Sequence, residues 1–260
     1  MIAPTPATQY TRPAPRQPSQ VSAPTSLRYL LGAWFVVVFL SLGALGWLCM
    51  FWPNEPARRR IIQKLARAIF ALGGCRIDWR DAARLPRGPC IVIANHQSYL
   101  DGPLLRALLP PPFNFVIKNS MRHAPLAGFL LRRIGSEFVE RSDRHKGAVD
   151  AKRFFHKASQ GGAWVVFPEG TFDTRIGVLP FLEGAFGAAR HAQLPVVCLS
   201  IQGTRAVLPS ERLWPCPHRL RVKLLNIYPA PTSREEIKRL AALTRAEIAH
   251  DIAEPLIERS

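Results

Sequence analysis

The feature that most constrains the fold of this chain is a run of 24 residues without a charge, residues 29–52. As an α-helix this run would be roughly 36 Å long, which exceeds the hydrocarbon core of a bilayer, about 30 Å thick. Aromatic residues lie at both of its ends, where interfacial anchors are expected, and Pro53 follows it. We therefore predict a transmembrane or membrane-inserted helix over residues 27–53.

Three other structures are possible for this run. A signal peptide would be shorter, would begin nearer the first residue and would end at a cleavage site. A buried helix of a soluble protein would rarely be this long without a polar face. A re-entrant hairpin remains an alternative, because Ser41, Gly43 and Gly46 interrupt the large apolar side chains.

The segments that flank the run differ in composition. Residues 1–26 hold six prolines among Ala, Ser, Thr and Gln, which predicts a disordered Pro-rich tail. Residues 54–74 predict a basic amphipathic helix, either on an anionic bilayer or as a domain helix with a solvated basic face. Its apolar stripe is Ile61, Leu65, Ile69 and Leu72, and its cations are Arg58, Arg59, Arg60, Lys64 and Arg67. This excess of cations after the run predicts an inner- or plasma-membrane protein whose C-terminal part is cytoplasmic.

Composition narrows the class of protein. Apolar residues make up 48% of the chain and charged residues 20%, which excludes a disordered chain. The five cysteines are widely spaced and form no C-x-x-C pair, which favours a reducing compartment over a disulfide scaffold. The net charge of +17 suits an anionic or acidic partner. We do not expect nucleic acid as that partner, because the cations are scattered and no nucleic-acid-binding motif appears.

Residues 75–260 alternate between strand-like and helix-like segments. This pattern predicts an α/β domain with a mostly parallel central sheet covered by helices. The predicted strands are 75–80, 90–94, 113–118, 137–140, 163–167, 195–201 and 219–225. The predicted helices are 103–109, 124–134, 146–159, 184–191 and a last one from Thr232 or Ser233 to about residue 253, where a capping box marks the start.

Residues suited to acid–base chemistry follow the predicted strand 90–94. His96 lies just past its end, and Asp101 lies five residues further on. Active sites of parallel α/β sheets collect at the carboxyl ends of strands. A loop of this length can fold back so that the carboxylate meets an imidazole nitrogen, which leaves the other nitrogen to take a proton from an alcohol. The alternatives are a core histidine and an aspartate that caps the next helix.

Three further blocks follow His96: residues 135–141, residues 167–171 (Phe-Pro-Glu-Gly-Thr) and residues 194–199. In this order and spacing, the four blocks resemble the glycerolipid acyltransferase family over about residues 73–230. The nearest member type is the 1-acyl-sn-glycerol-3-phosphate acyltransferase. The resemblance therefore implies a glycerolipid-acyltransferase-like domain after the membrane helix.

The resemblance also implies roles for individual residues. His96 would be the general base and Asp101 its orienting partner. The residues implied to bind the acceptor are Lys118, Arg141, Glu169, Gly170, Thr171 and Arg175. From the residues alone, a surface cation remains an alternative for Arg141, and a carboxylate that accepts backbone N–H groups in a strand-end turn remains an alternative for Glu169. We expect no metal, because His96 and Asp101 have no third ligand at suitable spacing.

Two positions depart from the phosphatidate-forming members of that family. Phe172 stands where an arginine often follows Glu-Gly-Thr, and Leu182 stands where a lysine often follows Pro-Phe. Arg175 is the candidate replacement for the first cation. Because these cations are absent, another lysolipid acceptor, such as an amino-lipid, remains an alternative. A non-catalytic membrane protein with the same fold is a second alternative.

The implied reaction transfers an acyl chain to the free hydroxyl of a lysophospholipid, most simply 1-acyl-glycerol-3-phosphate, giving phosphatidic acid in phospholipid biosynthesis. The expected partners are membrane lipids, the lysophospholipid, and acyl-CoA or an acyl-carrier-protein thioester, which is a co-substrate and not a bound cofactor. The sequence has no Gly-x-Ser-x-Gly elbow and no phosphate-binding glycine loop. We therefore predict direct transfer without an acyl-enzyme.

Overall fold

The structure is a computed structural model that describes residues 25–140, 144–211 and 214–259. The predicted Pro-rich tail, apart from its last two residues, and Arg141 lie outside the described residues.

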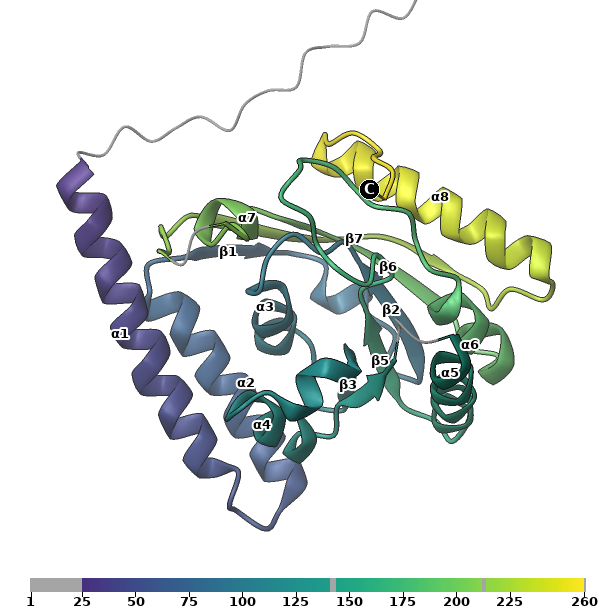
Figure 1. Cartoon of the computed structure of the whole chain (residues 1–260), viewed down its shortest axis with the longest axis horizontal. Coiled ribbons are helices and arrows are strands. Elements are labelled where there is room, and N and C mark those ends of the chain that lie inside the picture. Colours follow the sequence, from purple (N-terminus) through teal and green to yellow (C-terminus); the bar gives the residue numbers. More distant parts are fainter. Residues whose placement is uncertain (1–24, 141–143, 212–213, 260) are drawn as a thin grey trace, which may run out of the picture.

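The chain begins with two long helices that run side by side, α1 (Thr25–Cys49) and α2 (Glu55–Leu72) (Figure 1). α1 is one uninterrupted helix, so the small residues in its second half do not break it into a re-entrant hairpin. Among the described helices, α1 alone is long and apolar enough to cross a membrane, judged by length and composition. One side of it faces α2, and much of the other side is exposed apolar surface.

A seven-stranded sheet forms the centre of the rest, in the order β1-β7-β6-β2-β5-β3-β4. Strands β2 to β6 are mutually parallel, whereas β7 runs antiparallel to β6 and parallel to β1. The strands are β1 (Arg76–Trp79), β2 (Cys90–Ala94), β3 (Phe113–Lys118), β4 (Glu137–Val139), β5 (Ala163–Val166), β6 (Val196–Gln202) and β7 (Arg219–Tyr228). The predicted, mostly parallel sheet is therefore confirmed.

Helices cover both faces of the sheet (Figure 1). The remaining helices are η1 (Ala82–Arg84), α3 (Asp101–Leu108), η2 (Asn119–His123), α4 (Ala127–Arg133), α5 (Arg144–Ser159), α6 (Gly184–Ala192), α7 (Thr204–Val207) and α8 (Arg234–Ile252). α2 and α3 pack on one face, and α5, α6 and α8 pack on the other. The β-branched residues of the central strand β2 explain this arrangement: Val92 faces the first core, and Ile91 and Ile93 face the second.

α2 packs into the first core and is a helix of the folded domain. Its buried apolar side chains are Ile62, Ala66, Ile69 and Phe70. Of the predicted stripe, Ile69 is buried, Ile61 and Leu65 are half-buried and Leu72 is exposed, so the buried face is rotated from the predicted one. Its polar side is also used by the fold, because Gln63 Nε2 donates to Leu109 O at 2.6 Å and Arg67 Nε donates to Ala107 O at 2.6 Å. α2 thus satisfies carbonyl groups that the end of α3 would leave unpaired.

Candidate active site

The site begins where β2 ends, at a buried asparagine that holds the loop to the sheet. Asn95 is fully buried, its Oδ1 accepts from Ile201 N at 2.8 Å, and its Nδ2 donates to Ile201 O at 2.9 Å. The side chain thereby continues the pairing between β2 and β6 by one more position. No sequence motif pointed to Asn95, although its place directly before the predicted base is a usable signal.

His96 and Asp101 meet as predicted. His96 Nδ1 lies 2.8 Å from Asp101 Oδ2, and the same oxygen accepts from Gln97 N at 2.6 Å and Ser98 N at 2.8 Å. Asp101 is fully buried. Its carboxylate accepts from the loop backbone and contacts the imidazole. The N-cap alternative is wrong, because Leu100 is the N-cap of α3 and no side chain caps this helix. Three donors on one oxygen fix the orientation of the histidine ring.

The imidazole of His96 lies between aromatic rings. It stacks on Phe167 at 4.4 Å between ring centroids and meets Phe172 edge-on at 4.7 Å. Phe172 in turn meets Tyr99 edge-on at 4.7 Å, and Tyr99 is 62% exposed. The His96 side chain retains 20% exposure, and no described residue hydrogen-bonds its Nε2. A proton acceptor is therefore available at an apolar, partly open surface.

Glu169 follows the neighbouring strand β5. It connects the loop after β2, which carries His96, to the loop after β5. Its Oε1 accepts from His96 N at 2.6 Å and its Oε2 accepts from Leu179 N at 2.8 Å, in a side chain that is 1% exposed. Burial raises the pKa of Glu169 to about 7, although both backbone N–H groups favour the ionised form. Gly170 then turns the chain with a φ of 75°, which glycine adopts without strain. These contacts support the backbone-accepting alternative for Glu169.

The other predicted site residues differ in their exposure and in whether they are paired. Lys118 ends β3 at the same sheet edge, is exposed, and has no described partner. Thr171 is exposed. Arg175 Nη2 is 2.6 Å from Asp173 Oδ2 and also donates to Glu258 O at 3.0 Å, so its charge is already paired. The structure therefore does not present Arg175 as a free cation.

Glu254, just past the end of α8, also supports the loop that carries His96, which the sequence did not indicate. Gln97 Nε2 donates to Glu254 Oε1 at 2.9 Å, and Arg205 Nη2 lies 3.2 Å from Glu254 Oε2. Burial raises the pKa of Glu254. On the other side, Ser98 Oγ donates to Leu208 O at 2.7 Å, which ties the loop to the residue after α7.

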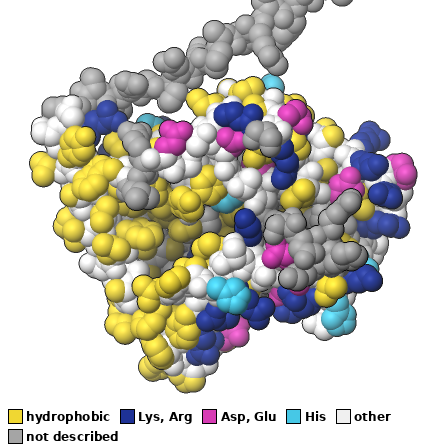
Figure 2. Space-filling view, viewed as in Figure 1, with side chains coloured by type: hydrophobic (Ala, Val, Ile, Leu, Met, Phe, Trp, Pro, Cys, Tyr) yellow, Lys and Arg dark blue, Asp and Glu magenta, His cyan; other side chains and the backbone are white. Residues whose placement is uncertain are grey.

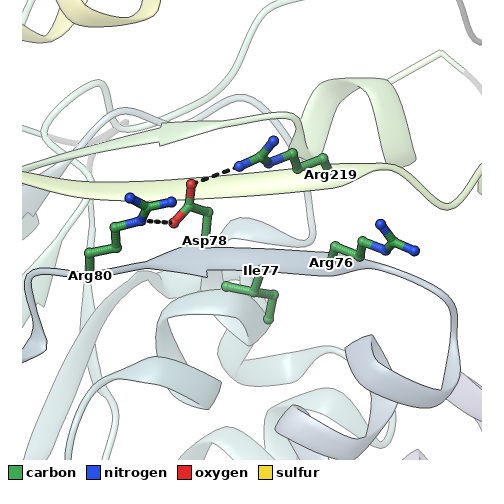
Figure 3. Close-up of a pocket in the computed structure, with 5 residues that line it drawn as sticks. All are labelled: Arg76, Ile77, Asp78, Arg80 and Arg219. Carbon is green, nitrogen blue, oxygen red and sulfur yellow. Dashed lines mark hydrogen bonds and ion pairs between the residues drawn. The ribbon is translucent and has the colours of Figure 1, made fainter.

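A surface hollow of about 340 Å³ lies elsewhere, at the start of β1 and β7 (Figure 3). It is lined by Arg76, Ile77, Asp78, Arg80 and Arg219. Asp78 bonds both Arg80 and Arg219 at 3.0 Å. Because β1 is an edge strand, we interpret this charged surface as protection of the sheet edge. Among the described residues, no group of three or more His, Cys, Asp and Glu side chains is arranged to hold a metal ion.

The chain is similar to known acyltransferases over much of its length. The sequence model of the family described as Acyltransferase matches residues 76–202. The 1-acyl-sn-glycerol-3-phosphate acyltransferase of Salmonella typhimurium is 29% identical over 212 residues, which cover 79% of this chain and 84% of that protein. The lyso-ornithine lipid O-acyltransferase of Pseudomonas aeruginosa is 30% identical over 182 residues, 68% of each chain. Across the curated relatives, the matched part spans from 38% to 84% of their length.

The fold has a solved counterpart as well. The crystal structure of the 1-acyl-sn-glycerophosphate acyltransferase PlsC from Thermotoga maritima superposes with a TM-score of 0.68 at 22% identity, covering 88% of this chain and 97% of that one. The sheet, its helical layers and the first helix thus form a known architecture. Together with the sequence matches, this shows that the chain belongs to the glycerolipid acyltransferase family and is an O-acyltransferase.

Proposed function

We propose that this chain transfers an acyl group from a thioester to the free hydroxyl of 1-acyl-glycerol-3-phosphate, giving phosphatidic acid. The observation that carries the proposal is the 2.8 Å contact of His96 Nδ1 with the buried Asp101, which leaves the other ring nitrogen without a described partner. The names of several relatives support this acceptor.

The proposed reaction is a direct transfer. The acceptor hydroxyl gives its proton to His96 Nε2 while its oxygen attacks the thioester carbonyl carbon. The tetrahedral intermediate then collapses, the C–S bond breaks, and the thiolate takes the proton back from the imidazolium. Asp101 stabilises the imidazolium between these steps, as a carboxylate does for a histidine base in other acyl-transfer enzymes. Donors of either kind, acyl-CoA or an acyl carrier protein, satisfy this chemistry.

Lys118 is our candidate for binding the acceptor phosphate or the developing oxyanion. It lies at the carboxyl end of β3, beside β5 in the sheet, and its ammonium has no described partner. A free cation near a developing negative charge is the arrangement that electrostatic catalysis requires. We assign Arg141 to the same phosphate on the family resemblance alone, and Thr171 to the rim of the acceptor site.

The test is to give the purified full-length chain a panel of lysolipids with labelled acyl-CoA or acyl carrier protein, and to identify each product by mass. We expect phosphatidic acid as the main product, and at least a hundredfold lower rate for His96→Ala. His156→Ala, which removes an exposed histidine on α5, is the matched control and should keep the rate. Normal turnover by a folded His96→Ala would refute the proposed mechanism.

A second acceptor class is an amino-lysolipid. The rings of Phe172 and Tyr99 border the catalytic imidazole, and ring faces attract an ammonium group and repel a phosphate. The Pseudomonas relative is named for a lyso-ornithine lipid. In the same panel, preference for an amino-lysolipid would identify this class, and Phe172→Arg should then shift the preference toward the phosphate acceptor.

We also propose that α1 holds the enzyme in the inner or plasma membrane, with the catalytic domain in the cytoplasm. Apolar side chains gather over the side of the molecule that α1 forms (Figure 2). The exposed ones on α1 include Leu30, Trp34, Leu40 and Leu48. Resistance to alkaline extraction from membranes tests the anchoring. A tag at the N-terminus that is labelled only from outside the cell would show that α1 spans the bilayer, and labelling only after lysis would show that it does not.

A further inference from the structure

Arg106 is a buried cation that the proposed mechanism does not use. It lies on α3, is 5% exposed, and no described carboxylate pairs with it. Its Nε and Nη2 have no hydrogen-bond partner among the described residues. Its guanidinium carbon lies 4.5 Å from the centroid of the Phe115 ring, which offers a cation–π contact and no acceptor. At least two donors of this side chain are therefore unsatisfied.

A second guanidinium adds to the positive charge at this place. Arg59 on α2 has a side chain that is 14% exposed, and its Nε also lacks a described partner. Burial, and the positive charge of Arg59, lower the pKa of Arg106 to about 10, which indicates that the two groups repel each other. Glu55, at 2.7 Å from Arg59 Nη2, is the carboxylate that pairs with Arg59, and it is about half exposed.

The surroundings of Arg59 are shaped to admit its side chain. A Cβ atom on Gly135 would lie 2.1 Å from Arg59 Nη2 and 3.2 Å from Asn114 Oδ1, so only glycine leaves this space free. Asn114 Oδ1 and the hydroxyl of Ser136 are also buried without a described partner. Of these unpaired groups, the Ser136 hydroxyl can donate to an anion as the guanidinium groups can, whereas Asn114 Oδ1 can only accept.

A buried cation such as Arg106, with unpaired donors and a second guanidinium beside it, is unfavourable unless an anion compensates it. We propose that Arg59 and Arg106 bind a phosphate-type oxyanion, supplied by a lipid headgroup or by free phosphate. The planar guanidinium fork suits the tetrahedral oxygens of phosphate. Arg59, which is the less buried of the two, gives the anion its route from the surface.

This site is separate from the catalytic one. Arg59 Nη1 approaches Pro111 O, which precedes the start of β3, whereas His96 lies at the carboxyl edge of the sheet. Phe115, under Arg106, lies three residues before Lys118, roughly 10 Å along the strand. Anion binding here is therefore measurable without reference to acyl transfer.

The test is the thermal unfolding of the full-length chain in detergent, with phosphate or chloride at equal ionic strength, and in phosphatidylcholine vesicles with or without phosphatidic acid. At about a hundredfold excess over the dissociation constant, a bound anion should raise Tm by roughly 5–10 °C. A shift with phosphate identifies free phosphate as a ligand. A shift with phosphatidic acid alone identifies the lipid headgroup.

Arg106→Met gives the decisive comparison. This variant should be more stable than the parent without the anion, because an uncompensated charge is gone. Its Tm should respond less to the anion than that of the parent, and the response that remains would come from the proposed acyl-transfer site. If Arg106→Met does not fold, Arg59→Met should show the same loss of response. Arg60→Met, on the exposed side of α2, is the matched control and should keep the full response. Equal responses of the parent and the folded Arg106→Met, or no response of the parent in either medium, would overturn the proposal.

Discussion

The role of Asp101 gives the sharpest prediction, because one oxygen has both a structural and a catalytic duty. Asp101 Oδ2 accepts from Gln97 N and Ser98 N, which are buried, and from His96 Nδ1. Asp101→Ala removes the acceptor of both backbone groups. Asp101→Asn keeps an oxygen for all three donors but removes the negative charge.

These contacts set the magnitudes. Each buried N–H left without an acceptor costs about 1–3 kcal/mol, so Asp101→Ala should lower the free energy of unfolding by about 2–6 kcal/mol. For a chain of this size, that is a drop in Tm of roughly 5–20 °C. In Asp101→Asn the amide NH₂, with two N–H donors, takes the place of Oδ1, which already has no described partner. One unpaired group thus replaces another while both backbone N–H groups keep their acceptor, so this variant should lose less stability than Asp101→Ala. Without the charge that stabilises the imidazolium, kcat should fall by about 10²–10⁴ in both variants.

Two measurements separate the duties: thermal unfolding, and kcat for acyl transfer in membranes or detergent. We expect Asp101→Asn to lose most of the activity with the smaller loss of stability. Asp78→Asn changes an exposed ion pair on β1 and should leave both quantities unchanged. Near-normal turnover by Asp101→Asn would refute the catalytic role of the carboxylate. An equal Tm for the two Asp101 variants would refute its structural role as acceptor of the two backbone N–H groups.

Three further predictions follow from the site. Asn95→Leu leaves Ile201 N and O unpaired at a buried position. The free energy of unfolding, measured in denaturant, should therefore fall by about 2–4 kcal/mol, and an unchanged value would contradict the pairing. Because the folded pKa of Glu169 is raised to about 7, its contribution to stability is complete below about pH 4.5 and is lost as the pH rises through 7. The parent should therefore lose about 3 kcal/mol over this range relative to Glu169→Gln, and parallel stability curves would contradict the shift. Lys118→Met should raise the KM for the acceptor at least tenfold, and Tm should not change because the side chain is exposed. A lower kcat at constant KM would show that Lys118 stabilises the oxyanion instead.

Local patterns in the sequence predicted the strands and the longer helices, whereas the short helices η1, η2 and α7 were not predicted. The charge-free run predicts α1, and the short β-branched runs predict β2 and β3 at the bounds that the structure shows. The last helix begins at its capping serine, where Ser233 Oγ accepts from Glu236 N at 3.1 Å. Periodicity, caps and breakers act over a few residues, so the sequence alone contains them.

The contact between His96 and Asp101 could also be predicted, because both residues belong to one short loop after one strand. The partners of that loop were not visible. Glu169 binds His96 N from 73 residues away, and Asn95 binds Ile201 from 106 residues away. Such contacts depend on which strands are neighbours in the sheet and on their register, which no local pattern records.

The sequence by itself thus determined the long apolar helix, the α/β alternation and the meeting of His96 with Asp101. Only the tertiary structure decided that α2 buries a different stripe from the predicted one, that Arg175 is paired, and that Arg106 is buried without a counter-charge. The physical reason is that the burial and the pairing of a side chain depend on surfaces that distant segments of the chain form together. The energy of a charge is set by those surfaces, and not by its neighbours along the chain.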